Sequence, residues 1–283
     1  MEIEFLKLMG CGSDLLLVDC RKQPSVQAAS VGVLASKILD RRNGVGADLL
    51  VLLSLTPEGG PALRTWDPRG EETDPSSGAL ACAARYGFDA GFARREGFPL
   101  EQRSGTVQAR IIDSVHSRLT LGPPLAPDTL ETIREIPNAP SPRTITLEGK
   151  LLPYVAVRFG QSYGVFFTSD LAFHGSAMAS KIAAQDDFPP ETQIGFVRID
   201  SREALRLKAW QRCGAPDRGR HAAAAVVAAV LQGFSDREVF VHVLRSRLFV
   251  QWTEESNVVH LTVPATYIFT GTYDYVEEKQ QSD

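Results

Sequence analysis

A short polar run before an alanine-rich segment holds the residues best suited to chemistry. Residues 217–221 read DRGRH, and residues 222–231 contain only Ala, Val and Leu. Because a helix that is apolar on every side must be buried, we predict a core helix that begins near this run and stops at Gly233. The free N–H groups and the positive dipole end of a first turn favour an anion. The run therefore predicts a ligand cleft at the start of the helix.

The same run offers groups for proton transfer and for anion binding. The positive end of the helix dipole disfavours the imidazolium of His221, so its neutral ring can accept or donate a proton near pH 7. Alternatively, His221 caps or supports the helix. Arg218 or Arg220 can bind a substrate carboxylate through two parallel hydrogen bonds. Alternatively, these arginines pair with acids across the cleft and close it, which predicts a non-catalytic relative.

Acidic residues gather in the polar segment 67–77, before a second segment of small residues, 78–88. The acids are Asp67, Glu71, Glu72 and Asp74. Asp74 is a candidate for proton transfer at the start of the second helix. Alternatively, it is the N-cap, since an Asp before a helix accepts its N–H bonds and gains from the dipole. The last three acids are the expected partners of the arginines in a closed cleft.

The composition limits the class of protein. The chain has 283 residues, 43% hydrophobic and 23% charged, with a formal net charge of −4, which suits one large or two medium globular domains. The sequence contains no dense Lys/Arg run of the kind that binds nucleic acid, and no apolar run of membrane-spanning length. It opens with MEIE rather than with a signal peptide. A cytoplasmic location is therefore expected.

The cysteines and histidines lack metal-ligand spacing, and four cysteines are too few for a disulfide scaffold of this size. We therefore expect no metal. Cys82 falls in the second small-residue segment and is interpreted as a core residue. Cys11, in the turn 10–14 (GCGSD), and Cys213 are candidate thiols near the cleft. That turn either exposes N–H groups to a ligand or is an ordinary hairpin.

Two units of similar order predict a duplicated α+β architecture, in which each half is a strand-rich layer wrapped around one buried helix. The predicted domains are residues 1–122, a proline-rich crossover at 123–143, and residues 144–283, with a terminal strand that can be exchanged with the first half. Further helices are predicted at residues 26–39 and 177–184. Strands are predicted at residues 3–8, 15–19, 49–55, 62–66, 100–102, 107–112, 118–121, 151–159, 164–168, 192–200, 205–210, 239–243, 248–252 and 258–263.

Four motifs in the same order resemble diaminopimelate epimerase over essentially the whole chain. They are residues 5–15 (FLKLMGCGSDL), 44–48 (GVGAD), 194–196 (IGF) and 206–212 (RLKAWQR). The resemblance implies a cofactor-free racemase or epimerase, in which one cysteine at each central helix N-terminus acts on opposite faces of an amino-acid α-carbon. It further implies a small-molecule substrate in a cleft between the halves and a homodimer. The aromatic segment 267–275 is either exposed for that dimer or a final core strand.

Where the family chemistry would lie, this sequence departs from the pattern. The first family thiol falls at Pro75 or Ser76, and the second falls at Arg218 or Arg220. Both thiols are therefore expected to be missing, which argues against diaminopimelate epimerisation.

The expected ligand set is altered as well. Ser13 and Leu49 stand where the family has Asn and Gln, residues 67–70 (DPRG) replace Asn-Ala-Asp-Gly, residues 160–163 (GQSY) replace Gly-Asn-Pro-His, and Gln193 replaces Asn. Such swaps leave buried polar groups unpaired with the old substrate and favour a less polar one. We expect substrate contacts from Cys11, Ser13, Leu49, Asp67, Glu72, Ser76, Ser77, Gly78, Gln161, Tyr163, Gln193, Asp217 and Gly219.

Residues 74–79 (DPSSGA) resemble the Asp-Pro-Ala-Thr-Gly-Ser motif of the phenazine-biosynthesis isomerase family, which shares the fold and moves protons with carboxylate and histidine. This resemblance favours Asp74 and His221. The leading hypothesis is a cofactor-independent isomerase or cyclase acting on a non-standard metabolite of specialised biosynthesis. Two alternatives remain: an inactive homologue that serves as a binding or regulatory protein, and a racemase with relocated thiols at Cys11 or Cys213.

Overall fold

The chain divides into two compact units that are interleaved in sequence. The computed structural model describes residues 1–126, 133, 142–172, 175–186, 188–212 and 217–276. Unit 1 comprises Met1–Ser117 together with the stretch that begins at Pro264, and unit 2 comprises Arg118–Val263. The predicted halves, 1–122 and 144–283, differ from these units at their ends, because the last strand returns to unit 1 as a partner of the first. Most of the predicted crossover at 123–143 lies outside the described residues.

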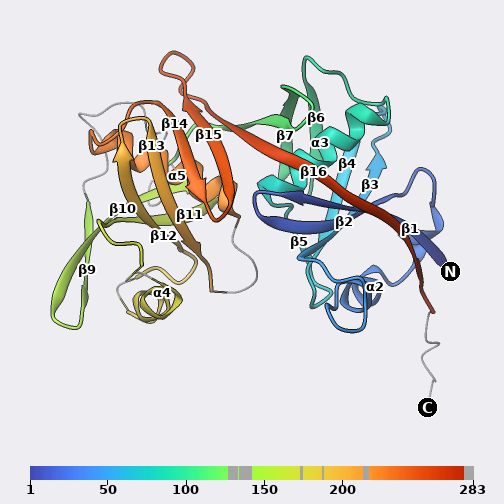
Figure 1. The fold of residues 1–283 in the computed structure, drawn as a ribbon, viewed down its shortest axis with the longest axis horizontal. Coiled ribbons are helices and arrows are strands. Elements are labelled where there is room, and N and C mark those ends of the chain that lie inside the picture. Colours follow the sequence, from blue (N-terminus) through green and yellow to red (C-terminus); the bar gives the residue numbers. More distant parts are fainter. Residues whose placement is uncertain (127–132, 134–141, 173–174, 187, 213–216, 277–283) are drawn as a thin grey trace. The chain divides into compact units, whose positions relative to one another are not determined.

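Unit 1 is a sheet that closes around one helix. Its elements are β1 (Glu2–Gly10), β2 (Ser13–Asp19), α1 (Ser25–Ala28), α2 (Val31–Ile38), β3 (Leu49–Leu55), β4 (Pro61–Trp66), β5 (Glu72–Thr73), α3 (Ser77–Asp89), β6 (Phe98–Gln102), β7 (Gly105–Ile111) and the start of β8 (His116–Gly122), which continues into unit 2. The strand order is β1-β2-β3-β4-β6-β7-β8, and β16 (Val259–Asp274) pairs with both β8 and β1. The path of strands therefore closes on itself, and α3 packs against β1, β2, β3 and β7 inside it (Figure 1).

The two faces of this sheet carry different helices. Leu16, Val18, Leu50 and Leu52 pack with α2 in one apolar cluster. Because successive residues of a strand point to opposite faces, the residues between them face α3. This double coverage explains why β2 and β3 are almost continuously apolar.

Unit 2 repeats the order of unit 1. Its elements are β9 (Arg143–Leu147), β10 (Lys150–Phe159), β11 (Gln161–Phe167), α4 (Ser176–Ala183), β12 (Gln193–Ser201), β13 (Ala204–Trp210), α5 (Arg218–Leu231), β14 (Glu238–Val243) and β15 (Ser246–Trp252). The pairings β2–β3 and β11–β12 are both parallel and occupy equivalent positions. The predicted duplicated α+β fold is therefore confirmed.

The alanine-rich helix α5 lies in the core of unit 2. All residues from Ala222 to Leu231 are buried, and α5 packs against β10 to β15 (Figure 1). Small side chains let the strands approach the helix axis, and Ala has the highest helix propensity. The opposite face of the sheet carries α4, packed with Ala156, Phe166 and Phe196.

The sequence predictions of several elements need correction. The single helix predicted at 26–39 is two helices, because Ala29 takes an extended conformation with ψ of 164° and ends α1. The strand predicted at 258–263 runs on to Asp274, because residues 265–274 pair with β1. The short strands β5 and β9 were not predicted. Within the described part of the chain, no helix is long and apolar enough to cross a membrane.

Candidate functional site

The N-terminus of α3 is capped by a serine. The Ser76 hydroxyl oxygen accepts a hydrogen bond from the Ala79 N–H at 3.2 Å, and Ser76 has an extended backbone with ψ of 160°. The interpretation of Asp74 as the N-cap is therefore wrong, because the cap geometry falls two residues later. Asp74 is exposed, whereas Ser77 and Gly78 are buried in the first turn.

The tip of the β1–β2 hairpin packs directly on this helix start. A Cβ atom on Gly78 would lie 2.3 Å from the Gly10 carbonyl oxygen, so the two backbones touch where no side chain fits. The turn itself, Cys11-Gly12, has positive φ at both residues, 53° and 73°, as a type I′ hairpin requires. Cys11 and Ser13 are 3% and 5% exposed. The predicted contacts Cys11, Ser13, Ser76, Ser77 and Gly78 therefore share one end of unit 1.

Leu49 lies on the strand next to this hairpin. It begins β3, and its backbone is opposite Leu15 in the parallel β2–β3 pair. Since Leu50 faces α2, Leu49 and Ser13 both point to the face that α3 covers.

Asp67 and Glu72 are engaged in local contacts. Asp67 accepts hydrogen bonds from the N–H groups of Arg69 and Glu71 and pairs with the Arg69 guanidinium at 2.8 Å. Glu72 receives two hydrogen bonds of 2.8 Å from Arg64, and this guanidinium lowers the pKa of the Glu72 carboxyl. The structure places both carboxylates in the turn and edge strand that precede α3.

The N-terminus of α5 is capped by a charged residue. Asp217 Oδ1 accepts hydrogen bonds from the N–H groups of Gly219 and Arg220 at 3.1 and 3.2 Å. Its Oδ2 accepts a third hydrogen bond, of 2.8 Å, from the Arg220 guanidinium. The protein's own carboxylate therefore occupies two of the N–H groups at this helix start, and the predicted anion site stays a prediction.

His221 lies directly behind this cap and is 2% exposed. Its Nδ1 is 2.8 Å from the Asp217 carbonyl oxygen, and its Nε2 is 3.4 Å from the Trp210 carbonyl oxygen. Burial lowers the pKa of His221, although the carbonyl and the charge of Asp217 oppose that shift. A neutral ring carries one N–H, and the shorter contact assigns it to Nδ1. Nε2 faces the Trp210 carbonyl oxygen inside the buried site.

Tyr163 and Gln193 share the face of the sheet that α5 covers. The Tyr163 ring meets the His221 ring edge-on at 4.9 Å, and Tyr163 is opposite Gln193 in the β11–β12 pair. Burial, together with the charge of Asp217, raises the pKa of the Tyr163 hydroxyl. The buried Gln193 Oε1 has no hydrogen-bond partner among the described residues. Gln161 begins the same strand as Tyr163 but is exposed.

The remaining predictions concern ion pairs, thiols and metals. Arg220 pairs with Asp217, Glu72 with Arg64 and Glu71 with Arg69, each within its own unit.

Cys82 is fully buried in α3, and burial raises its pKa to about 12, as suits a core residue. Cys213 lies outside the described residues. Among the residues that the structure describes, no cluster of His, Cys, Asp and Glu could hold a metal ion. The expected cleft between the halves concerns the placement of the units and stays a prediction.

Sequence reasoning missed a network of charged residues beside the hairpin. Lys7, Asp14, Arg41 and Asp48 are joined by ion pairs of 2.7 to 3.0 Å. The available signal was that the turns GCGSD and GVGAD both end in an aspartate, but a sequence does not show that the two carboxylates meet.

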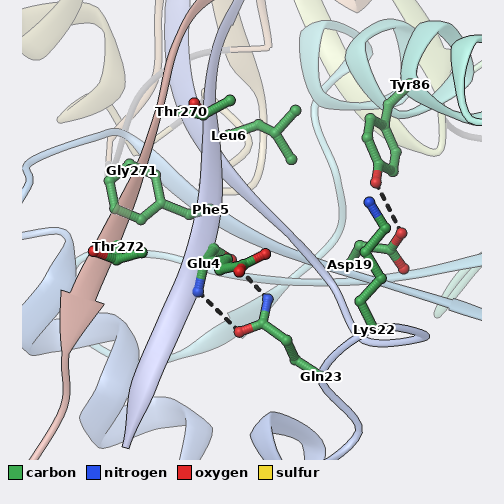
Figure 2. A pocket seen from close by; sticks show the side chains of 10 residues that line it. All are labelled: Glu4, Phe5, Leu6, Asp19, Lys22, Gln23, Tyr86, Thr270, Gly271 and Thr272. Atoms are coloured by element: carbon green, nitrogen blue, oxygen red, sulfur yellow. Dashed lines mark hydrogen bonds between the residues drawn. The ribbon is translucent and has the colours of Figure 1, made fainter.

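A cavity of about 360 Å³ lies in unit 1 on the face of β1 and β16 beside the C-terminal half of α3 (Figure 2). Its wall includes Asp19, which accepts hydrogen bonds from Tyr86 at 2.8 Å and from Arg21. Gln23 forms two hydrogen bonds with the backbone of Glu4. None of the predicted site residues lines this cavity.

Comparisons with known proteins identify the family. No protein-family model matches the chain. The diaminopimelate epimerase of Pelotomaculum thermopropionicum is 32% identical over 286 residues, which cover 96% of this chain and 99% of the relative. The diaminopimelate epimerase of Moorella thermoacetica is 30% identical over 284 residues, with coverage of 96% and 99%.

Solved structures show the same fold at low sequence identity. A phenazine biosynthesis protein of the PhzF family from Enterococcus faecalis matches with a TM-score of 0.69 and 12% identity, over 97% of this chain and 100% of that one. A probable proline racemase from Agrobacterium radiobacter matches with a TM-score of 0.67 and 15% identity, over 99% and 94%. The strand-rich fold with one central helix per unit thus defines a diaminopimelate-epimerase-like protein.

The identity to curated relatives over nearly the whole chain is more specific than the fold. This chain belongs to the diaminopimelate epimerase family. The relatives carry the names of epimerases, which confirms the predicted resemblance at the level of the family.

Proposed function

We propose that this protein is a cofactor-independent isomerase or cyclase in which the two-thiol chemistry of the family has been replaced. Its substrate is a small non-standard metabolite with a carboxylate, of the kind found in specialised biosynthesis. The observation that carries the proposal is the pair of caps. Ser76 and Asp217 cap the N-termini of α3 and α5, the helix starts at which the resemblance calls for cysteines at Pro75 or Ser76 and at Arg218 or Arg220.

Asp74 and His221 are the proposed proton-transfer groups. Asp74 is exposed, and Ser76 performs the capping that would otherwise engage its carboxylate. Burial lowers the pKa of His221, and a neutral imidazole is the form required of a general base. Because Nδ1 is held by the Asp217 carbonyl, the ring orientation is fixed.

Arg218 and Arg220 are the proposed carboxylate-binding groups. Arg220 already contacts Asp217 at 2.8 Å, so its fork is held in place before substrate arrives, which lowers the entropic cost of binding. Leu49 and Tyr163, at positions where the family has polar side chains, support a less polar substrate.

The test is proton NMR in D₂O on diaminopimelate, ordinary amino acids and unsaturated carboxylic acids, watching for enzyme-dependent loss of C–H signals. The proposal predicts exchange into an unsaturated acid. Asp74→Asn and His221→Gln are each expected to slow this exchange about 100-fold or more, with Asp170→Asn, at an exposed aspartate outside the predicted site, as a matched control. Unchanged exchange in either variant would remove that residue from the mechanism.

Two other outcomes favour the alternatives. Exchange into an amino acid, abolished by a thiol alkylator and protected by substrate, would indicate a racemase that uses Cys11 or Cys213. Silence across the panel, with no ligand-induced rise in melting temperature, would indicate an inactive homologue that acts as a binding or regulatory protein.

We also propose a homodimer through β16. Tyr267, Ile268 and Phe269 are 40%, 48% and 47% exposed on consecutive positions, and exposed apolar strands of this kind favour association. A molar mass of one chain by light scattering, unchanged in Phe269→Lys, would contradict the dimer.

A further inference from the structure

The charged network beside the β1–β2 hairpin joins the two glycine-containing turns. Arg41 contacts Asp14 Oδ1 at 2.7 Å and Asp48 Oδ1 at 2.8 Å through one nitrogen, and Asp14 Oδ2 at 3.2 Å through the other. Lys7 contacts Asp14 at 3.0 Å and the Gly46 carbonyl oxygen at 2.5 Å. One cation therefore bridges the start of β2 to the residue that precedes β3.

The two carboxylates are held close to each other by the backbone. The Asp14 N–H donates to Asp48 Oδ2, and the Asp48 N–H donates to Asp14 Oδ1, both at 3.2 Å. Side chains of Asp14 and Asp48 are 15% and 26% exposed. Two carboxylates in such an arrangement repel each other unless a cation lies between them. Without Arg41, the backbone hydrogen bonds would hold two carboxylates together that repel each other.

The residues next to the bridged aspartates are the candidate substrate contacts Ser13 and Leu49. Asp14 lies on the α2 face with Leu16, so Ser13 points to the opposite, α3 face, as Leu49 does. We propose that Arg41 is a positioning residue: it joins Asp14 to Asp48 on one face and thereby fixes the positions of Ser13 and Leu49 on the other. The link to substrate rests on the proposed function, whereas the positioning itself does not.

Arginine suits this role better than lysine. Its planar fork reaches both carboxylates at once, whereas an ammonium is a single point charge. Burial opposes ionisation of Asp14, but hydrogen bonds from Arg41 and Lys7 outweigh it and lower the Asp14 pKa to about 2. The bridge is therefore fully charged at neutral pH.

The direct test is amide hydrogen exchange by NMR on Arg41→Gln, Arg41→Lys and the matched control Arg42→Gln, whose side chain is exposed next to the bridge. We expect Arg41→Gln to speed exchange of the Asp14 and Asp48 amides about tenfold and to shift the Ser13 and Leu49 signals. The amides of Ala81 and Ala83, in the core of α3, should not change. The Asp14 and Asp48 amides of Arg41→Lys should exchange at rates between those of the wild type and Arg41→Gln. The rates in Arg42→Gln should match the wild type. Unchanged Ser13 and Leu49 signals in Arg41→Gln would overturn the inference.

A kinetic measurement on the unsaturated acid that exchanges in D₂O checks the link to substrate. Arg41→Gln is expected to raise KM about tenfold and to leave kcat within about threefold. A loss confined to kcat, or no change, would overturn that link. If wild-type protein exchanges no acid of the panel, the proposed function fails, and the amide exchange alone still decides whether Arg41 positions Ser13 and Leu49.

Discussion

The N-termini of α3 and α5 occupy equivalent positions in the two units, yet they are built with different chemistry. At α3 the cap is a neutral hydroxyl, Ser76, and the next residues are small and buried. At α5 the cap is a carboxylate, Asp217, which takes two N–H groups and a guanidinium, with a neutral His221 behind it.

The difference shows how a duplicated scaffold can separate tasks. The first turn of α3 offers small buried residues that pack against the β1–β2 hairpin, whereas the first turn of α5 offers charge and a titratable ring. The Asp217 carboxylate already interacts with the positive end of the α5 dipole and with two of its N–H groups.

The largest expected effect concerns the tips of two hairpins, β1–β2 in unit 1 and β10–β11 in unit 2. Gly78→Ala places a Cβ 2.3 Å from the Gly10 carbonyl oxygen, and backbone atoms cannot move aside, so we expect a loss of about 3 kcal/mol in the free energy of unfolding. In unit 2, a Cβ on Gly160 has no described atom within 4 Å, and only its φ of 72° opposes substitution. Gly160→Ala should cost about 1 kcal/mol. Urea unfolding of both variants checks the pair, and equal losses would contradict the contrast.

The caps should differ in their contribution to stability. Asp217→Ala removes the N–H acceptor and the Arg220 partner together, so we expect it to lower the free energy of unfolding by about 2 kcal/mol. Ser76→Ala removes one hydrogen bond and should lower it by about 1 kcal/mol. Asp217→Asn retains the cap and loses the charge, so it should fall between them. The same urea measurement applies, and a costlier Ser76→Ala would reverse the comparison.

The pH dependence of folding stability should arise from His221 in α5. Burial depresses the pKa of His221 in the folded protein below its ordinary value of about 6.5, so the unfolded chain binds the proton more tightly. The resulting stability is present above about pH 6.5 and is lost as pH falls toward the folded pKa, about 1 kcal/mol by one unit lower.

Unfolding free energies at pH 7.0 and 5.5 for wild type, His221→Gln and His260→Gln separate this effect, because burial lowers the His260 pKa as well. Equal pH slopes in wild type and His221→Gln would show that His221 is not the group responsible.

The sequence predicted what depends on local composition. The alanine helix α5, the small-residue helix α3 and the apolar strand β3 follow from propensity and burial patterns. The predictions that were wrong concern features that depend on backbone torsion angles or on contacts between residues far apart in the sequence. Asp74 and Ser76 are both good caps, and only the chain path selects Ser76. The extension of β16 requires a partner, β1, at the other end of the chain.

The site was predictable in part for the same reason. Cys11, Ser13 and Gly78 could be placed near a helix start by their order alone, but the contact of Gly10 with Gly78 arises from packing. The bridge from Arg41 to Asp14 and Asp48 depends on the parallel β2–β3 pair, which a single sequence does not specify.

The central claim is that proton transfer in this protein does not use a thiol. The most direct measurement is deuterium incorporation from D₂O into the exchanging panel acid by the double variant Cys11→Ser/Cys213→Ser, beside wild type. The account predicts a rate within about threefold of wild type, since serine has nearly the shape of cysteine and no base is removed. A rate about 100-fold lower, with the melting temperature unchanged, would contradict it and assign the chemistry to a relocated thiol.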